Sequence, residues 1–139
     1  MTGRDPLDPA EVMMANDLAS AALGMEVIEL SAGHAVVRMA ITAAMVNGHD
    51  IAHGGYLFLL ADTAFACACN SGRSTTVAAG ADIDFLAPAR LGDVLEATAD
   101  ERVAFGRSGI TDVTVRRLED GVVMAEFRGR SRQLRAPSA

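Results

Sequence analysis

One carboxylate, Asp62, stands inside a long apolar stretch, the run YLFLLADTAFACACN at residues 56–70. Thr63 is the only polar residue beside it. A carboxylate withdrawn from water is costly unless it is paired, protonated or functional, and buried ionisable groups concentrate at active sites. The pattern therefore indicates a catalytic nucleophile or general base at Asp62. Two structural roles compete: the N-cap of a helix that begins at Thr63, or a hydrogen-bonded group in an interface.

The glycine pair Gly54-Gly55 stands directly before this run. Glycine lets a ligand approach the backbone, and the first N–H groups of a helix have no partner within the helix. Those N–H groups also lie at the positive end of the helix dipole, where they can stabilise an oxyanion. A plain turn is the alternative interpretation. Together with a carboxylate two turns further along, Gly55 favours acyl-transfer chemistry.

Two histidines, His49 and His53, flank Asp50 and raise the question of a metal site. Asn47-Gly48 and the glycine pair argue against a helical arrangement of these ligands, and no third ligand has a recognisable spacing. We therefore expect no bound metal. His53, next to the glycines, is the better functional candidate, and the role of His49 stays open. On spacing alone, Asn47 is a turn residue.

Composition narrows the class of protein. A chain of 139 residues, half of them hydrophobic, fits one compact domain. Its net charge of −6 argues against binding to nucleic acid or to an anionic membrane. All 12 basic residues are Arg, so Schiff-base and P-loop lysine chemistry are excluded.

Three further features bear on location and assembly. The N-terminus has no apolar signal core and no uncharged stretch is long enough to span a membrane, so we expect a cytoplasmic protein. Cys67 and Cys69 have no CxxC or metal-ligand pattern and are expected to be core thiols in a reducing compartment. The chain is rich in apolar residues but has few large ones. This composition favours an oligomer, in which the apolar interior continues across an interface between subunits.

The pattern of apolar residues predicts the elements that position these groups. We expect a lead helix at about residues 9–23, an ordered loop at 42–55, and a helix at 56–70 that is buried on all sides. The expected strands are residues 25–30, 34–41, 75–85, 94–103, 110–118 and 122–134. The tail at 136–139 is expected to fray. This is a single α+β domain, residues 1–139, in which one antiparallel sheet curls around one helix.

At this point three motifs resemble those of a known family. The run NGHDIAHGGYLFLLADTAFACACNS at residues 47–71, then DIDFLAP and LGD, resembles the hot-dog-fold acyl-CoA thioesterases. The resemblance is closest to the phenylacetic acid degradation (PaaI-type) branch, which is related to the 4-hydroxybenzoyl-CoA thioesterases. It implies a hot-dog fold, a curved antiparallel β-sheet wrapped around a long central α-helix, with an extra N-terminal helix. It also implies a homotetramer, a dimer of dimers with active sites at the dimer interface.

The resemblance assigns roles residue by residue. Asp62 matches the carboxylate that attacks the thioester or activates water, and the Gly55 N–H matches the group that polarises the thioester carbonyl. Asn47 and His53 match positions that order the nucleophilic water and the loop, which replaces the plain turn role for Asn47.

One residue departs from the family pattern. Relatives often carry an Arg where this chain has Ala87. If that Arg holds the phosphates of coenzyme A (CoA), Arg90 or Arg107 is expected to replace it.

The resemblance implies hydrolysis of an aryl-, phenylacetyl-type or medium-chain acyl-CoA to the free acid and CoA. No cofactor is expected, since CoA is part of the substrate. Two alternatives remain: a hot-dog acyl-CoA dehydratase or hydratase, and a non-catalytic acyl-CoA-binding module.

Overall fold

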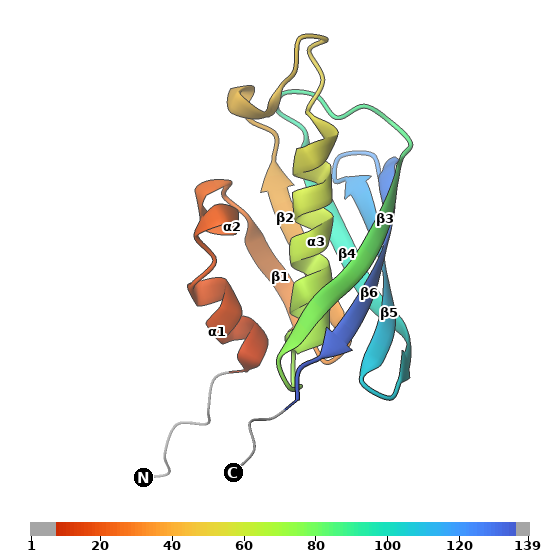
Figure 1. Ribbon diagram of the computed structural model, residues 1–139. Helices are drawn as coiled ribbons and strands as arrows, with labels where there is room; N and C mark the ends of the chain where they lie inside the picture. The colour runs from red at the N-terminus through yellow and green to blue at the C-terminus, as the bar shows by residue number, and fades with distance from the viewer. Residues whose placement is uncertain (1–7, 136–139) are drawn as a thin grey trace.

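The computed structural model describes residues 8–135, in which six strands form one antiparallel sheet that curves around a long helix (Figure 1). The helix is α3 (Gly54–Asn70). The strands are β1 (Glu26–Ser31), β2 (His34–Ala40), β3 (Thr76–Phe85), β4 (Val94–Phe105), β5 (Ser108–Arg117) and β6 (Val123–Gln133), in the order β1-β2-β4-β5-β6-β3. This arrangement confirms the curved sheet and central helix expected of a hot-dog fold.

The concave face of the sheet holds the core. Along β5 the side chains alternate, so that Thr111, Val113 and Val115 are fully buried against α3 while their neighbours are only partly covered. Space next to the helix is tight at Gly129 of β6, where an added Cβ would lie 2.6 Å from the ring of Phe65. The buried ring of Phe65 thus fits in the core because Gly129 has no side chain.

Helix α3 is not covered on all sides, contrary to the prediction from its apolar sequence. Gly55, Leu59, Asp62 and Ala66 follow one another at helical spacings of four, three and four residues, and all of them stay exposed or half-buried. The sheet covers the opposite side of the helix, where Leu60, Ala61 and Ala64 are fully buried, for example. We call the four uncovered residues, Gly55 to Ala66 in this series, the open stripe of α3.

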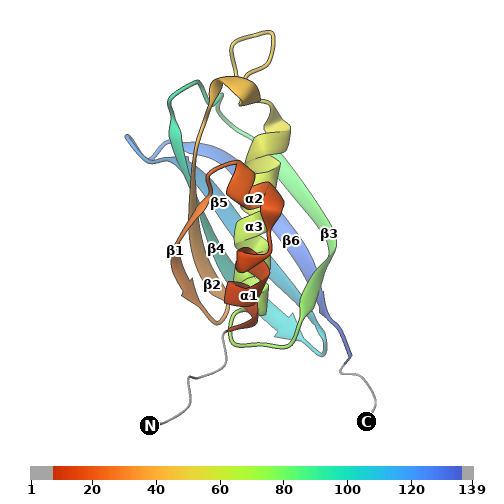
Figure 2. The ribbon, with the colours of Figure 1, turned by 90° about the vertical axis from the view of Figure 1, so that its left-hand side faces the viewer.

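The lead segment packs on α3, as Figure 2 shows, but it is not one continuous helix. It folds as α1 (Pro9–Ala15) and α2 (Leu18–Ala22). The break has a local cause, because the carboxylate of Asp17 accepts a hydrogen bond from the Ser20 N–H at 2.9 Å and caps a new helix. The tail predicted to fray, residues 136–139, lies outside the described residues.

The loop that leads into α3 has little regular structure, as predicted. It contains a short 3-10 helix, η1 (Ala43–Met45), and a single bridge between Val46 and Ala52. In Figure 1 this loop, the connection from β3 to β4 and the first turn of α3 gather at one end of the molecule. Between residues 8 and 135, no helix is long and apolar enough to cross a membrane.

Candidate functional site

The first turn of α3 presents unpaired backbone N–H groups. His53 is the N-cap residue, and its carbonyl accepts a hydrogen bond from the Tyr56 N–H at 3.0 Å. The N–H groups of Gly54 and Gly55 find no backbone acceptor within residues 8–135. An added Cβ at Gly55 would meet no atom within 4 Å, so a ligand or another chain has room to approach. The side chain of His53 is exposed and makes no capping hydrogen bond.

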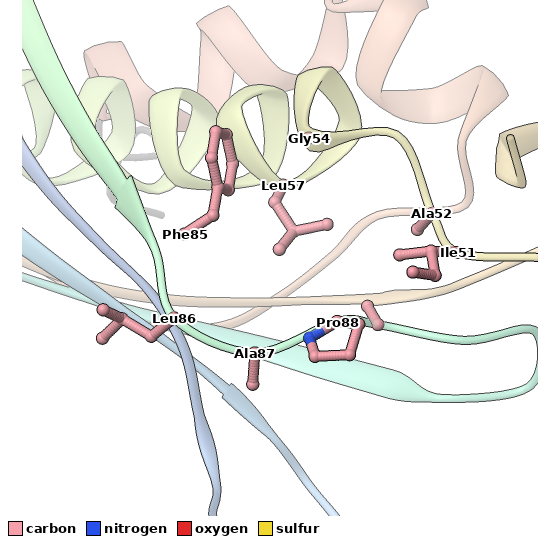
Figure 3. A pocket seen from close by; sticks show the side chains of 9 residues that line it. Ile51, Ala52, Gly54, Leu57, Phe85, Leu86, Ala87 and Pro88 are labelled. Atoms are coloured by element: carbon pink, nitrogen blue, oxygen red, sulfur yellow. The ribbon is translucent and has the colours of Figure 1, made fainter. Parts of the chain in front are cut away.

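The two glycines have different roles, which their sequence did not reveal. An added Cβ at Gly54 would lie 2.7 Å from the tip of the Phe85 ring, so the absence of a side chain lets Phe85 pack on the start of α3. Phe85 ends β3 and is 54% exposed. With Leu57, Leu86 and Pro88 it lines an apolar cavity of about 380 Å³ beside the helix start (Figure 3). The sequence held no signal for this cavity, because the exposure of Phe85 and its contact with Gly54 follow only from the fold.

Asp62 lies in the middle of α3 and not at its start, so the N-cap hypothesis for this residue is wrong. Its carboxylate is half-buried and makes no hydrogen bond or ion pair with any other described residue. It borders a cavity of about 200 Å³ between α3 and the edge strand β3, which Phe65, Cys69 and Val77 also line. Desolvation raises the pKa of Asp62 above its usual range, and the negative charge of Asp17 adds to that rise.

Gly55 and Asp62 share the open stripe, but they are separated along it. Seven residues of helix correspond to a rise of about 10 Å. The group that donates a hydrogen bond to a thioester carbonyl and the group that attacks it both contact the same carbonyl. These two groups must therefore lie within about 7 Å of each other. This separation makes it difficult for one protomer to bring the Gly55 N–H and the Asp62 carboxylate to the same carbonyl group.

Asn47 organises the loop before α3. Its side-chain oxygen accepts hydrogen bonds from the backbone N–H of His49 at 2.8 Å and of Ile51 at 3.2 Å. The turn held in this way includes Asp50 at a φ of 62°. The side chain of Asn47 therefore holds this turn, and ordering of a water by Asn47 stays a prediction.

The two arginines considered for CoA phosphates lie far apart. Arg90 is exposed in the connection from β3 to β4, just beyond the lining of the apolar cavity. Arg107 lies in the turn between β4 and β5, at the opposite end of the sheet in Figure 1. Within one protomer they do not form a single phosphate site.

The two thiols are core groups. Cys67 and Cys69 are both free and buried, as predicted. Burial raises the pKa of Cys67 to about 12, and burial also raises the pKa of Cys69. Since a thiol attacks as its thiolate, neither residue competes with Asp62 as a nucleophile near neutral pH.

The chain is similar to several known proteins. The family model of the thioesterase superfamily matches residues 49–124, which include Gly55 and Asp62. The acyl-coenzyme A thioesterase PaaI of Escherichia coli is 46% identical over 125 residues, covering 90% of this chain and 89% of that protein. A putative esterase of Deinococcus radiodurans is 42% identical over 109 residues, covering 77% of this chain and 73% of that protein. The solved structure of E. coli PaaI, from the phenylacetic acid degradation operon, has a TM-score of 0.88 at 44% identity and covers 92% of each chain.

Proposed function

Because this chain belongs to the thioesterase superfamily, we propose that it hydrolyses acyl-CoA thioesters to the free acid and CoA. The observation that carries the proposal is Asp62, a half-buried carboxylate with no protein partner among residues 8–135 that borders a cavity. The unpaired N–H of Gly55 on the same stripe supplies the second group that acyl transfer needs.

The reaction follows from these two groups. The Gly55 N–H, at the positive end of α3, stabilises the negative charge that develops on the carbonyl oxygen. Asp62 either attacks the carbonyl carbon or removes a proton from an attacking water. The carbon–sulfur bond breaks, and the departing thiolate of CoA takes up a proton. When water attacks, this step releases the free acid directly; when Asp62 attacks, it leaves an acyl-Asp62 anhydride, which a water then hydrolyses to the free acid and the Asp62 carboxylate. Both routes require an ionised Asp62 and end in the same products. No cofactor takes part.

The site is completed by a second copy of the chain. The separation of Gly55 and Asp62 along α3 supports this, since an antiparallel copy of the open stripe would bring its Asp62 toward this Gly55. The edge strand β3 supports it too, because its residues 77–79 are exposed and small or apolar beside that stripe. We propose a dimer of this kind, and a tetramer of two such dimers.

The acyl group binds in an apolar pocket. The cavity of about 380 Å³ lined by Leu57, Phe85 and Leu86 has the size and character for an aryl or phenylacetyl group or a medium-length chain. Asn47 and His53 order the neighbouring loop and the water. The position of Arg90 just beyond this cavity supports it as a ligand of the CoA phosphates.

Two reduced thiols support a cytoplasmic location for this activity. Cys67 and Cys69 lie two residues apart on α3, where their side chains do not face each other, and both are free and buried. Persistent free thiols are typical of a reducing compartment.

A panel of aryl- and aliphatic-CoA thioesters tests the activity. Release of CoA, detected with a thiol reagent, supports hydrolysis. A change in absorbance of an unsaturated acyl-CoA without a free thiol would instead support a hydratase. Binding of a thioester without either change would support a non-catalytic acyl-CoA-binding module.

A further inference from the structure

A chain of hydrogen bonds links the lead helices to the middle of α3. The Ser20 hydroxyl lies 2.7 Å from the Asp17 carboxylate and 3.0 Å from the Thr63 hydroxyl. A carboxylate only accepts, so the single hydroxyl proton of Ser20 goes to Asp17. Thr63 must then donate to Ser20, and the chain runs from Thr63 through Ser20 to Asp17.

This series of hydrogen bonds begins at Thr63, one residue from the reactive carboxylate of Asp62. Ser20 and Thr63 are buried, at 1% and 5% exposure, so the contact is shielded from water. Thr63 points into the molecule while the preceding residue, Asp62, lies on the open stripe. The contact therefore fixes α2 against the turn of α3 that carries Asp62, and it does so without occupying the Asp62 oxygens.

We propose that Asp17 is a positioning residue for Asp62. It holds the lead helices against α3 through Ser20 and Thr63, and it places a fixed negative charge near the reactive carboxylate. This inference rests on the proposed hydrolysis by Asp62. Repulsion between the two carboxylates disfavours ionisation of Asp62, which makes it a stronger base once it is ionised. The raised pKa of Asp62, to which the charge of Asp17 contributes after desolvation, agrees with this role.

Other charged groups near α3 do not act on Asp62 in this way. Asp8, the N-cap residue of α1, accepts a hydrogen bond from the Gly72 N–H, and Glu11 of α1 lines a separate groove toward β1. On β3, Asp82 pairs with Arg130 on the outer face of the sheet.

Asp84, two residues beyond Asp82 on β3, lies on the same outer face of the sheet. Glu101 of β4 pairs with Arg73 beyond the C-terminal end of α3. In the cavity that Asp62 borders, the other ionisable group is the thiol of Cys69. The charges of the other strands lie on the outer face, where Arg38 pairs with Glu96 and Arg128 with Asp112.

The pH dependence of kcat/KM in the full-length protein tests the proposal, because its acid limb reports the ionisation of Asp62 in the free enzyme. Asp17→Asn removes the charge but keeps a side chain that caps α2 well. We expect the acid limb to move to lower pH, since loss of the repulsion eases ionisation of Asp62. The plateau at higher pH should stay within about twofold of the wild-type value, because a small change in base strength has a small effect on rate.

Two variants serve as controls. Glu11→Gln removes a carboxylate from the lead helices at a position away from Asp62 and should leave the acid limb in place. Ser20→Ala removes the hydrogen bonds between Asp17 and Thr63 but keeps the charge of Asp17. It should therefore lower the melting temperature and leave the acid limb close to its wild-type position. Should Asp17→Asn fail to fold, Asp17→Ser, which is also a good cap, repeats the measurement.

The outcomes are distinct. An active wild-type enzyme whose acid limb is unmoved by either Asp17 variant would overturn the role of Asp17 and leave the proposed function intact. An equal shift with Glu11→Gln would also overturn it, since net charge would then explain the effect. A wild-type protein that releases no CoA from any thioester would refute the proposed function, and this inference with it.

Discussion

Gly55 and Asp62 lie on the same face of α3, about 10 Å apart along the helix axis. In the proposed mechanism each supplies one half of what thioester hydrolysis needs, and their separation favours a site that two subunits share. The Gly55 N–H points out from the end of the helix, and Asp62 opens on the gap beside β3. The proposed shared site would explain why this stripe of α3 is left open, and under that proposal the assembly of the protein is part of its chemistry.

Mixed oligomers should recover activity that neither parent has. Gly55→Val and Asp62→Asn each damage every site of a homodimer. In a mixed dimer, one site combines the intact Gly55 of one subunit with the intact Asp62 of the other. After unfolding and refolding of an equal mixture, half of the dimers are mixed, and each mixed dimer has one intact site of two. The mixture should therefore have about one quarter of the activity of the same amount of wild type. Activity of the mixture no higher than the mean of its parents would argue that the site lies within one subunit.

Substitution of Gly55 alone should separate turnover from binding. The space around Gly55 is open, so Gly55→Val should fold, but its side chain stands where the carbonyl oxygen would approach. We expect kcat to fall about 100-fold or more, the scale of losing an oxyanion donor, with a much smaller change in the Kd for CoA measured by calorimetry. Equal losses in both quantities would count against an oxyanion role.

The neighbouring glycine should affect stability instead. A methyl group at Gly54 meets the tip of the Phe85 ring, which is free to move toward solvent, so Gly54→Ala should lower the free energy of unfolding by about 1 kcal/mol. Gly55→Ala is the matched control, since its methyl group meets nothing and should leave stability unchanged or slightly raised. Adding Phe85→Leu to Gly54→Ala should restore part of the loss in denaturant unfolding. A Gly54→Ala protein as stable as wild type would contradict the close contact between Gly54 and Phe85.

A histidine on the outer face should make stability depend on pH. His34 lies between two carboxylates, with Nε2 at 2.7 Å from Glu29 and Nδ1 at 2.7 Å from Asp100, which ties β1 to β2 and β4. Both ring nitrogens can donate only in the protonated ring, and these hydrogen bonds raise the pKa of His34 above 6.5.

The sign of this effect follows from linkage. The contribution of His34 is fully present below the unfolded-state pKa and is lost as the pH rises through the higher folded-state pKa. The melting temperatures of wild type and His34→Gln should therefore differ at about pH 6 and converge at about pH 9. The difference should be small, since all three side chains are substantially exposed. A difference that grows with pH would show that the protonated ring is not the stabilising form.

Much of this structure can be predicted from the sequence. Asp62 stood out because burying a carboxylate in an apolar helix is costly unless the group is paired, protonated or functional. The strands were predicted from their alternating apolar residues and from the turn residues between them. Gly33, Gly106 and Gly121 adopt positive φ in the turns of the three hairpins, as breaks in the apolar pattern indicated.

What the sequence did not reveal depends on contacts between distant segments. The different roles of Gly54 and Gly55 rest on Phe85, which the fold brings back to the start of α3. The break at Asp17 was hidden because the apolar pattern of the lead segment continues through it. An apolar helix sequence also does not show whether the helix is buried by its own chain or by a second copy. The open stripe of α3 therefore could not be predicted.

The measurement that most directly tests the central claim is CoA release by Asp62→Asn, compared with wild type on the best thioester of the panel. Asparagine keeps the size of the side chain but can neither attack the carbonyl nor accept a proton from water. The variant should keep the melting temperature and oligomeric state of wild type, and its kcat should fall at least about 100-fold. A folded Asp62→Asn protein that retains most of its activity would contradict the assignment of Asp62 as the reactive carboxylate.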